Sequence, residues 1–123
     1  FPNNKIFVDS KKKDLSLFSG CLIKINEKER LSIPDENKKD LDIIITKGPL
    51  GCEYNGEIYH TKSVEVYDVC GAGDVFLSSL VTRWLETNDI GLSIKTANNC
   101  ASLSVTKMGC YTIQREEYEN LRV

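Results

Sequence analysis

The sequence lacks the features that mark several classes of protein. No apolar run is long enough to cross a bilayer, so we expect no membrane partner. The 16 Lys and Arg residues are balanced by 18 Asp and Glu, and the net charge of −2 provides no basic surface for nucleic acid. What is present is a chain of 123 residues, 41% of them hydrophobic, which is enough for one folded domain with a modest core.

The chain also lacks the cysteine patterns of disulfide scaffolds and structural zinc sites. Its 5 cysteines are odd in number, and no two of them are spaced as Cys-x-x-Cys. We therefore expect reduced thiols in a cytoplasmic protein, with most of the cysteines acting as small apolar filler. Cys70 differs from the others because it directly precedes a glycine-rich turn.

Short apolar segments alternate with turns in the first half of the chain. The patterns predict strands at 5–9, 21–26, 41–46 and 63–69, with a hairpin at 52–61 around Asn55-Gly56. Helical periodicity follows at 73–87 and from Ile94 to Met108, and a last short helix is expected at 115–121. This order indicates an α/β fold. The strands have few helices to cover them, which suggests part of a larger fold.

A glycine-rich turn within residues 66–81, VYDVCGAGDVFLSSLV, joins a predicted strand to a predicted helix. Backbone N–H groups at such a helix N-terminus bind anions, and residues 71–73 leave room for a phosphate to approach the backbone. Asp74 then lies in the first helical turn and has two interpretations. It either caps the helix or acts as a general base that takes a proton from a hydroxyl during phosphoryl transfer.

Two other glycine-rich motifs are excluded by the same residues. A dinucleotide-binding fingerprint needs a third glycine where Phe76 stands. A P-loop needs a Gly-Lys-Ser/Thr sequence, which the chain does not contain.

The segment Asp68-Val69-Cys70-Gly71-Ala72-Gly73-Asp74 resembles the C-terminal signature of the ribokinase-like, or phosphofructokinase B, carbohydrate kinases. Further segments are similar to family motifs and occur in the family order: Asn26 to Glu29, Thr46 to Gly51, and Thr96 to Gly109. The resemblance implies the C-terminal part of a three-layer α/β sandwich with a mostly parallel sheet. It also implies a kinase that transfers the γ-phosphate of ATP to a hydroxyl of a sugar or sugar phosphate.

The resemblance assigns the chemical step to the glycine-rich turn. Asp74 would activate the acceptor hydroxyl, and the backbone of Gly71, Ala72 and Gly73 would stabilise charge on the transferred phosphate. A monovalent cation would be held partly by carbonyls near Asp68. Family members usually carry Thr at the position of Cys70, so this chain has a thiol where they have a hydroxyl.

The resemblance assigns cofactor binding to other segments. Asn26 and Glu29 would position hydrated Mg²⁺ through water. The remaining contacts to ATP or ADP would come from Thr46, Gly48, Gly51 and Asn98.

Within the family, the segments Glu65 to Val69 and Lys107 to Gly109 look most like the kinase module of ADP-heptose synthase, which suggests a heptose 7-phosphate as acceptor. Family kinases are longer, so residues 1–123 are interpreted as a single nucleotide-binding half without the N-terminal half that contacts the sugar and forms the lid. We expect this chain to be inactive alone, and to self-associate or to pair with the missing half. Its single His excludes the His-x-Gly-His motif of the synthase's second module.

Three hypotheses remain open at this point. The chain is a carbohydrate kinase half-domain, or a nucleotide-binding module without transfer activity, or an unrelated α/β domain whose Gly71–Asp74 segment is only a capped turn. Alone, Asn26, Glu29 and Asn98 have ordinary explanations, as a turn residue, a first-turn acid and a solvated helix residue. Their joint order favours the kinase.

Overall fold

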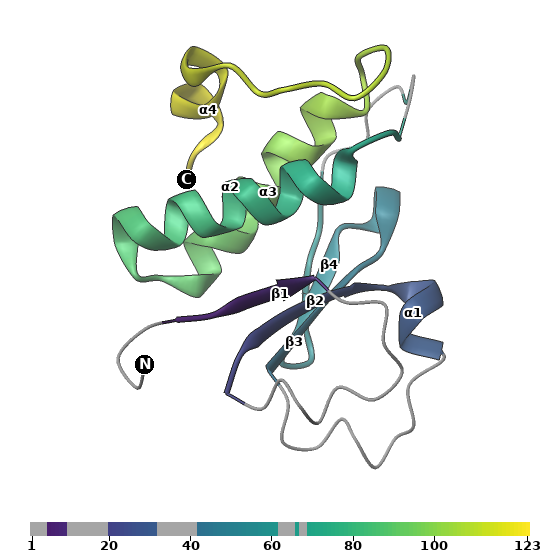
Figure 1. Cartoon of the computed structure of the whole chain (residues 1–123), viewed down its shortest axis with the longest axis vertical. Helices are drawn as coiled ribbons and strands as arrows, with labels where there is room; N and C mark the ends of the chain where they lie inside the picture. Colours follow the sequence, from purple (N-terminus) through teal and green to yellow (C-terminus); the bar gives the residue numbers. More distant parts are fainter. Residues whose placement is uncertain (1–4, 10–19, 32–41, 62–65, 67–68) are drawn as a thin grey trace. The chain divides into compact units, whose positions relative to one another are not determined.

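The computed structural model describes residues 5–9, 20–31, 42–61, 66 and 69–123, and these form two compact units. The first unit spans Phe1–Ile58 and the second spans Tyr59–Val123. Figure 1 shows strands in the first part of the sequence and long helices in the second. This order confirms the predicted α/β class.

In the described part of the chain, five strands form one mixed sheet in the order β1-β2-β3-β4-β5. They are β1 (Phe7–Asp9), β2 (Leu22–Asn26), β3 (Asp42–Thr46), β4 (Cys52–Tyr54) and β5 (Glu57–Tyr59). The pairs β1–β2 and β2–β3 are parallel, whereas β3–β4 is antiparallel. The mostly parallel start of the sheet agrees with the fold that the sequence predicted.

The central strands β2 and β3 form the core of the first unit. Ile23 and Ile25 pack with Ile45 on one face, and Ile44 on the other face is also fully buried. A strand that buries successive residues has both faces covered, as the apolar run at 41–46 predicted. Lys24 is also buried, and its ammonium pairs with the carboxylate of Asp9 at 3.3 Å.

Two connections in the first unit follow their local sequence. The predicted hairpin is confirmed, since Asn55 and Gly56 turn the chain from β4 to β5 with positive φ angles of 51° and 78°. After β3, the short 3₁₀ helix η3 (Gly48–Leu50) closes a loop in which the N–H of Lys47 donates to Gly51 at 2.8 Å. The short helix α1 (Glu27–Leu31) directly follows β2.

The second unit contains α2 (Ala72–Thr87), α3 (Ile90–Ser104) and α4 (Arg115–Leu121). α2 and α3 pack together and bury Val75, Phe76, Leu80, Ile94 and Ala97. From the sequence we expected a helix from Ile94 to Met108. Instead, α3 starts at Ile90 and ends at Ser104, and the side chain of Met108 is exposed. The start is explained by Asp89, whose carboxylate caps the helix by accepting from the N–H of Leu92 at 3.0 Å.

The strand that the sequence predicted at 63–69 falls mostly outside the described residues. Val66 and Val69 are described, and neither of them is assigned to a strand. Among the helices described, none has the length and apolar character needed to cross a membrane.

Candidate functional site

In the second unit, the glycine-rich turn leads directly into α2, as predicted. Gly71 is the N-cap and adopts a left-handed conformation with φ 74°, which glycine accepts without a steric penalty. The carbonyl of Gly71 receives the N–H of Val75 at 3.0 Å, while no side chain caps the helix. The N–H groups of the first turn therefore lie at the positive end of a helix of 16 residues.

Asp74 lies in this first turn and is exposed. Because no side chain makes a capping hydrogen bond at this helix, Asp74 does not act as an N-cap residue. It remains available as a general base, or as a first-turn acid that only favours the helix dipole.

An open cavity of about 630 Å³ adjoins Asp74 within the second unit. The polar face of α2 forms one wall with Asp74, Ser78 and Thr82. Residues of the segment that follows α3, and of α4, form the other wall: Cys110, Tyr111, Thr112, Ile113, Arg115 and Tyr118. A hollow of this size beside a helix N-terminus can hold a small ligand.

Hydrogen bonds hold the two tyrosines of this wall in place. The hydroxyl of Tyr111 donates to Glu117 at 2.6 Å, which lowers the pKa of that carboxyl and raises the pKa of Tyr111. The hydroxyl of Tyr118 donates to Glu86 of α2, and burial together with this bond raises the pKa of Tyr118 to about 12. Both phenols therefore stay protonated at neutral pH and keep donating to these two carboxylates.

Sequence reasoning did not single out Tyr111, Arg115 or Tyr118. Their segment showed only a short helical pattern, which gives no signal for the cavity that α2 completes. Arg115 is the positively charged residue among these three. Its guanidinium pairs with the carboxylate of Glu119 one helical turn away, at 3.2 Å.

Cys70 and Cys110 correct the expectation of reduced thiols. They form a disulfide between the glycine-rich turn and the segment after α3, across a sequence separation of 40 residues. Cys21, Cys52 and Cys100 lie outside this disulfide, and the last two are buried, as expected for apolar filler. Burial raises the pKa of the Cys100 thiol.

Asn98 is the only predicted site residue in α3. It is buried, and its side-chain amide donates to the carbonyl of Tyr59 at 3.1 Å within the second unit. The alternative interpretation of Asn98 as a solvated helix residue is therefore wrong, because its side chain is buried. The hydrogen bond satisfies the buried amide. A contact of Asn98 with nucleotide stays a prediction.

In the first unit, the structure brings Asn26, Glu29 and Thr46 to one end of the sheet. Asn26 and Thr46 are register partners at the carboxyl ends of the parallel strands β2 and β3. The N–H of Glu29 donates to Asn26 Oδ1 at 2.7 Å, and the N–H of Asn26 donates to Glu29 Oε1 at 3.0 Å. Gly48 and Gly51 follow in the loop after β3. Ligands of open α/β sheets bind at this end of the strands.

Glu29 provides a test of the predicted magnesium site. Its Oε1 accepts the N–H of Asn26, whereas its Oε2 is buried and has no hydrogen-bond partner among the described residues. A carboxylate oxygen without a partner fits a role in binding hydrated Mg²⁺, which prefers oxygen ligands and keeps much of its water. No cluster of three or more His, Cys, Asp or Glu occurs in the part of the chain that is described, so the fit concerns binding through water.

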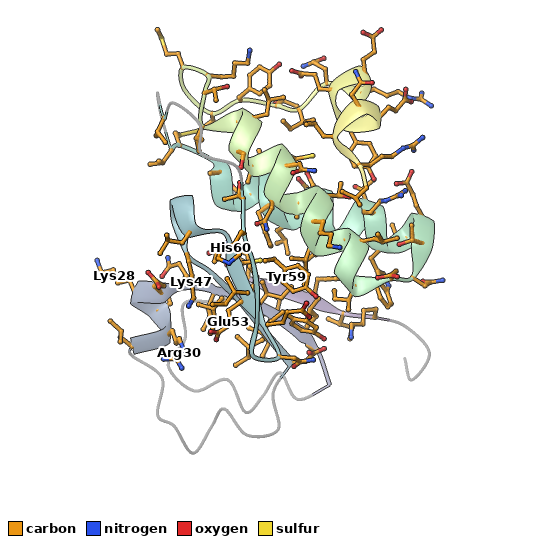
Figure 2. All side chains as sticks on the ribbon, turned by 180° about the vertical axis from the view of Figure 1, so that it is seen from behind. Lys28, Arg30, Lys47, Glu53, Tyr59 and His60 are labelled. Carbon is orange, nitrogen blue, oxygen red and sulfur yellow. A yellow bond between two sulfur atoms is a disulfide. The ribbon has the colours of Figure 1, made fainter. Side chains whose placement is uncertain are left out.

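Basic side chains also lie around this end of the first unit. Figure 2 shows Lys28 and Arg30 projecting from α1, on either side of Glu29 in the sequence. Lys47 follows β3 and is held by Glu53 of β4, with 3.4 Å between ammonium and carboxylate. The predicted Mg²⁺ residues and Thr46, Gly48 and Gly51 thus belong to one unit, whereas Asn98 and Gly71–Asp74 belong to the other.

Comparisons with known proteins show the family of this chain. The model of the pfkB family carbohydrate kinases matches residues 20–117. The Bifunctional protein HldE of Sulfurimonas denitrificans is 33% identical over 94% of this chain, and the chain covers 29% of that protein. Relatives of this name confirm the predicted resemblance to ADP-heptose synthase.

Solved structures show the same fold. Ribokinase from Thermotoga maritima has a TM-score of 0.76 at 21% identity, and the match covers 97% of this chain and 49% of the ribokinase. A ribokinase II of Escherichia coli in complex with ATP and Mg²⁺ has a TM-score of 0.70 at 22% identity, with 85% and 40% covered. The chain thus spans less than a third of its curated relative and about half of the ribokinase. With nearly four fifths of its length matched by the family model, the chain belongs to the pfkB family of carbohydrate kinases.

Proposed function

We propose that this chain is the nucleotide-binding half of a kinase that transfers the γ-phosphate of ATP to a hydroxyl of a sugar or sugar phosphate. The observation that carries the proposal is the exposed Asp74 in the first turn of α2, next to N–H groups that no side chain caps and beside an open cavity. The HldE relatives favour a heptose 7-phosphate as the acceptor.

Each group at the N-terminus of α2 has a role in the proposed reaction. Asp74 takes the proton of the acceptor hydroxyl. The hydroxyl oxygen attacks the γ-phosphorus of ATP, and the bond between this phosphorus and ADP breaks. The backbone of Gly71, Ala72 and Gly73, with the helix dipole, stabilises charge on the transferred phosphate. A monovalent cation is proposed near Asp68, a residue outside the described part of the chain.

The first unit supplies the proposed cofactor site. Glu29 and Asn26 hold hydrated Mg²⁺, which supplies positive charge to the triphosphate when bound. Thr46, Gly48 and Gly51 form the nucleotide side of this site at the end of β3. Asn98 of the second unit is proposed separately as a nucleotide contact. The E. coli ribokinase II structure, solved with ATP and Mg²⁺, supports these two ligands.

The test compares the wild-type chain with Asp74→Asn, which removes the base and keeps the shape of the side chain. Calorimetric titration with Mg-ATP should give binding to both proteins, because the proposed base does not hold the nucleotide. When an N-terminal half of a family kinase is added, wild type should gain transfer, and the variant should be slower by about 10²- to 10⁴-fold.

Asp89→Asn is the matched control, since it makes the same exchange at the cap of α3, where Asn caps as well as Asp. It should leave both binding and transfer unchanged. Full transfer by Asp74→Asn would contradict the assigned base. Absence of ATP binding to a folded chain, both alone and complemented, would contradict the proposed nucleotide site.

A further inference from the structure

The disulfide between Cys70 and Cys110 joins two exposed residues. Their Cα atoms are 4.9 Å apart, within the usual range for a disulfide. Cys52 and Cys100 are buried, and burial also raises the pKa of the Cys100 thiol, so both react slowly with reagents in water. Cys21 is partly exposed and lies outside the disulfide, so it is the reference thiol against which the Cys70–Cys110 pair is compared.

This pair lies directly against the N-terminus of α2. Cys70 precedes the N-cap Gly71, and Cys110 lines the same cavity as Asp74. A Cβ placed on Gly71 would be 3.4 Å from Cys110 Cβ and 3.5 Å from its sulfur. The disulfide therefore lies where a side chain at Gly71 would begin.

One backbone amide of the predicted phosphate site is already used in this arrangement. The N–H of Ala72 donates to the carbonyl of Val69 at 3.2 Å, which closes a turn with Cys70 inside it. The disulfide anchors this turn to the segment after α3. An anion at the N-terminus of α2 cannot receive the N–H of Ala72 until the turn rearranges.

We propose that Cys70 and Cys110 are a reversible thiol–disulfide switch, whose oxidised form keeps the Ala72 amide inside its turn and weakens phosphate binding at the N-terminus of α2. The inference rests on the proposed function, which supplies the ligand. Exposed disulfides are typically labile or regulatory, whereas structural disulfides resist reduction.

The oxidation balances with a small disulfide such as glutathione disulfide as oxidant. The thiolate of one cysteine attacks a glutathione sulfur, breaks that S–S bond and releases one glutathione thiolate. The second cysteine thiolate then attacks the resulting mixed disulfide, forms the Cys70–Cys110 bond and releases the second glutathione. The protein pair loses two electrons and two protons, and two molecules of reduced glutathione carry them away.

The test prepares the chain in glutathione disulfide and again after reduction with dithiothreitol. Alkylation and peptide mass spectrometry should find 3 free cysteines after oxidation and all 5 after reduction. Hydrogen exchange should be faster at the Ala72 amide in the reduced form. Mg-ATP should bind the reduced form about tenfold more tightly, because one more N–H can donate to a charged ligand.

Matched variants separate the switch from general effects of oxidation. Cys70→Ser and Cys110→Ser should each behave as the reduced chain under both conditions, whereas Cys21→Ser should respond as wild type does. Oxidation that leaves all cysteines free, or that pairs other cysteines, overturns the proposal.

The same experiment distinguishes failure of the switch from failure of the proposed function. Equal exchange and equal ATP affinity in the two forms overturn the switch and leave the nucleotide site standing. A difference in Ala72 exchange without ATP binding to either form supports the switch and contradicts the proposed function.

Discussion

At the scale of single residues, Glu29 uses its two carboxylate oxygens differently. Oε1 accepts the N–H of Asn26 and secures the start of α1, while the buried Oε2 has no partner among the described residues. The reciprocal bonds between Asn26 and Glu29 have the form of a capping box, which explains the local structure without any ligand. Only the second oxygen requires another explanation, and Mg²⁺ is the proposed one.

Glu29→Gln separates these two roles, because Gln can keep the capping box but carries no charge. We expect the helix content to stay the same. The Mg²⁺ concentration needed for ATP binding should rise by about tenfold or more, as for other residues that orient metal ligands. Calorimetry of ATP binding across a Mg²⁺ series measures this. Glu27→Gln, in the same helical turn, is the control and should have no effect. Equal responses of the two variants would contradict the Mg²⁺ role.

At the scale of elements, α2 shows what a periodic pattern can and cannot predict. The sequence placed this helix at 73–87, and the structure has it at Ala72–Thr87. Leu80 and Leu85 both belong to the apolar residues at helical spacing in this segment, but Leu85 is 76% exposed while Leu80 is 1% exposed. The period follows from the backbone, whereas the buried side of the helix depends on where α3 packs.

Truncation of these two leucines tests the packing of α2 on α3. Leu80→Ala should lower the free energy of unfolding by about 2–5 kcal/mol, because it leaves a cavity in the core. Leu85→Ala should change the free energy of unfolding by less than about 0.5 kcal/mol, because its side chain already contacts water. Urea denaturation followed by circular dichroism measures both. Similar losses in the two variants would show that the described packing is wrong.

At the scale of the whole molecule, the chain spans about half of a ribokinase, and this sets its expected activity. Phosphoryl transfer depends on positioning and on charges in a site that excludes water. Asp74 is exposed in this chain, and contact with water weakens electrostatic interactions severalfold. A partner segment that covers the site is therefore expected to be needed for catalysis.

We expect little or no ADP release when this chain alone is given ATP, Mg²⁺ and a heptose 7-phosphate. Addition of an N-terminal half of a family kinase should restore product formation, and the half without this chain is the control. A coupled ADP assay with mass spectrometry of the sugar product measures the outcome. ATP- and sugar-dependent product from the chain alone would contradict the expectation.

The sequence by itself determined the features that depend on neighbouring residues. The buried strands, the Asn55-Gly56 hairpin and the start of α2 at the glycine-rich turn follow from side-chain alternation, positive φ angles and helix periodicity. The order of short motifs was also sufficient to predict the family. In the candidate site, Asp74 in the first turn of a helix could be predicted from the local pattern. Asn26 and Glu29 were named only through their resemblance to the family motif, and their reciprocal hydrogen bonds were not predicted.

Only the tertiary structure decided which distant residues meet. It paired Cys70 with Cys110, buried Asn98 against the Tyr59 carbonyl and completed the cavity beside Asp74 with Tyr111. Such contacts join segments that lie up to 40 residues apart, and they depend on how helices pack rather than on the residues next to each partner in the chain. Local patterns carry the period of an element, but packing fixes its orientation and its neighbours.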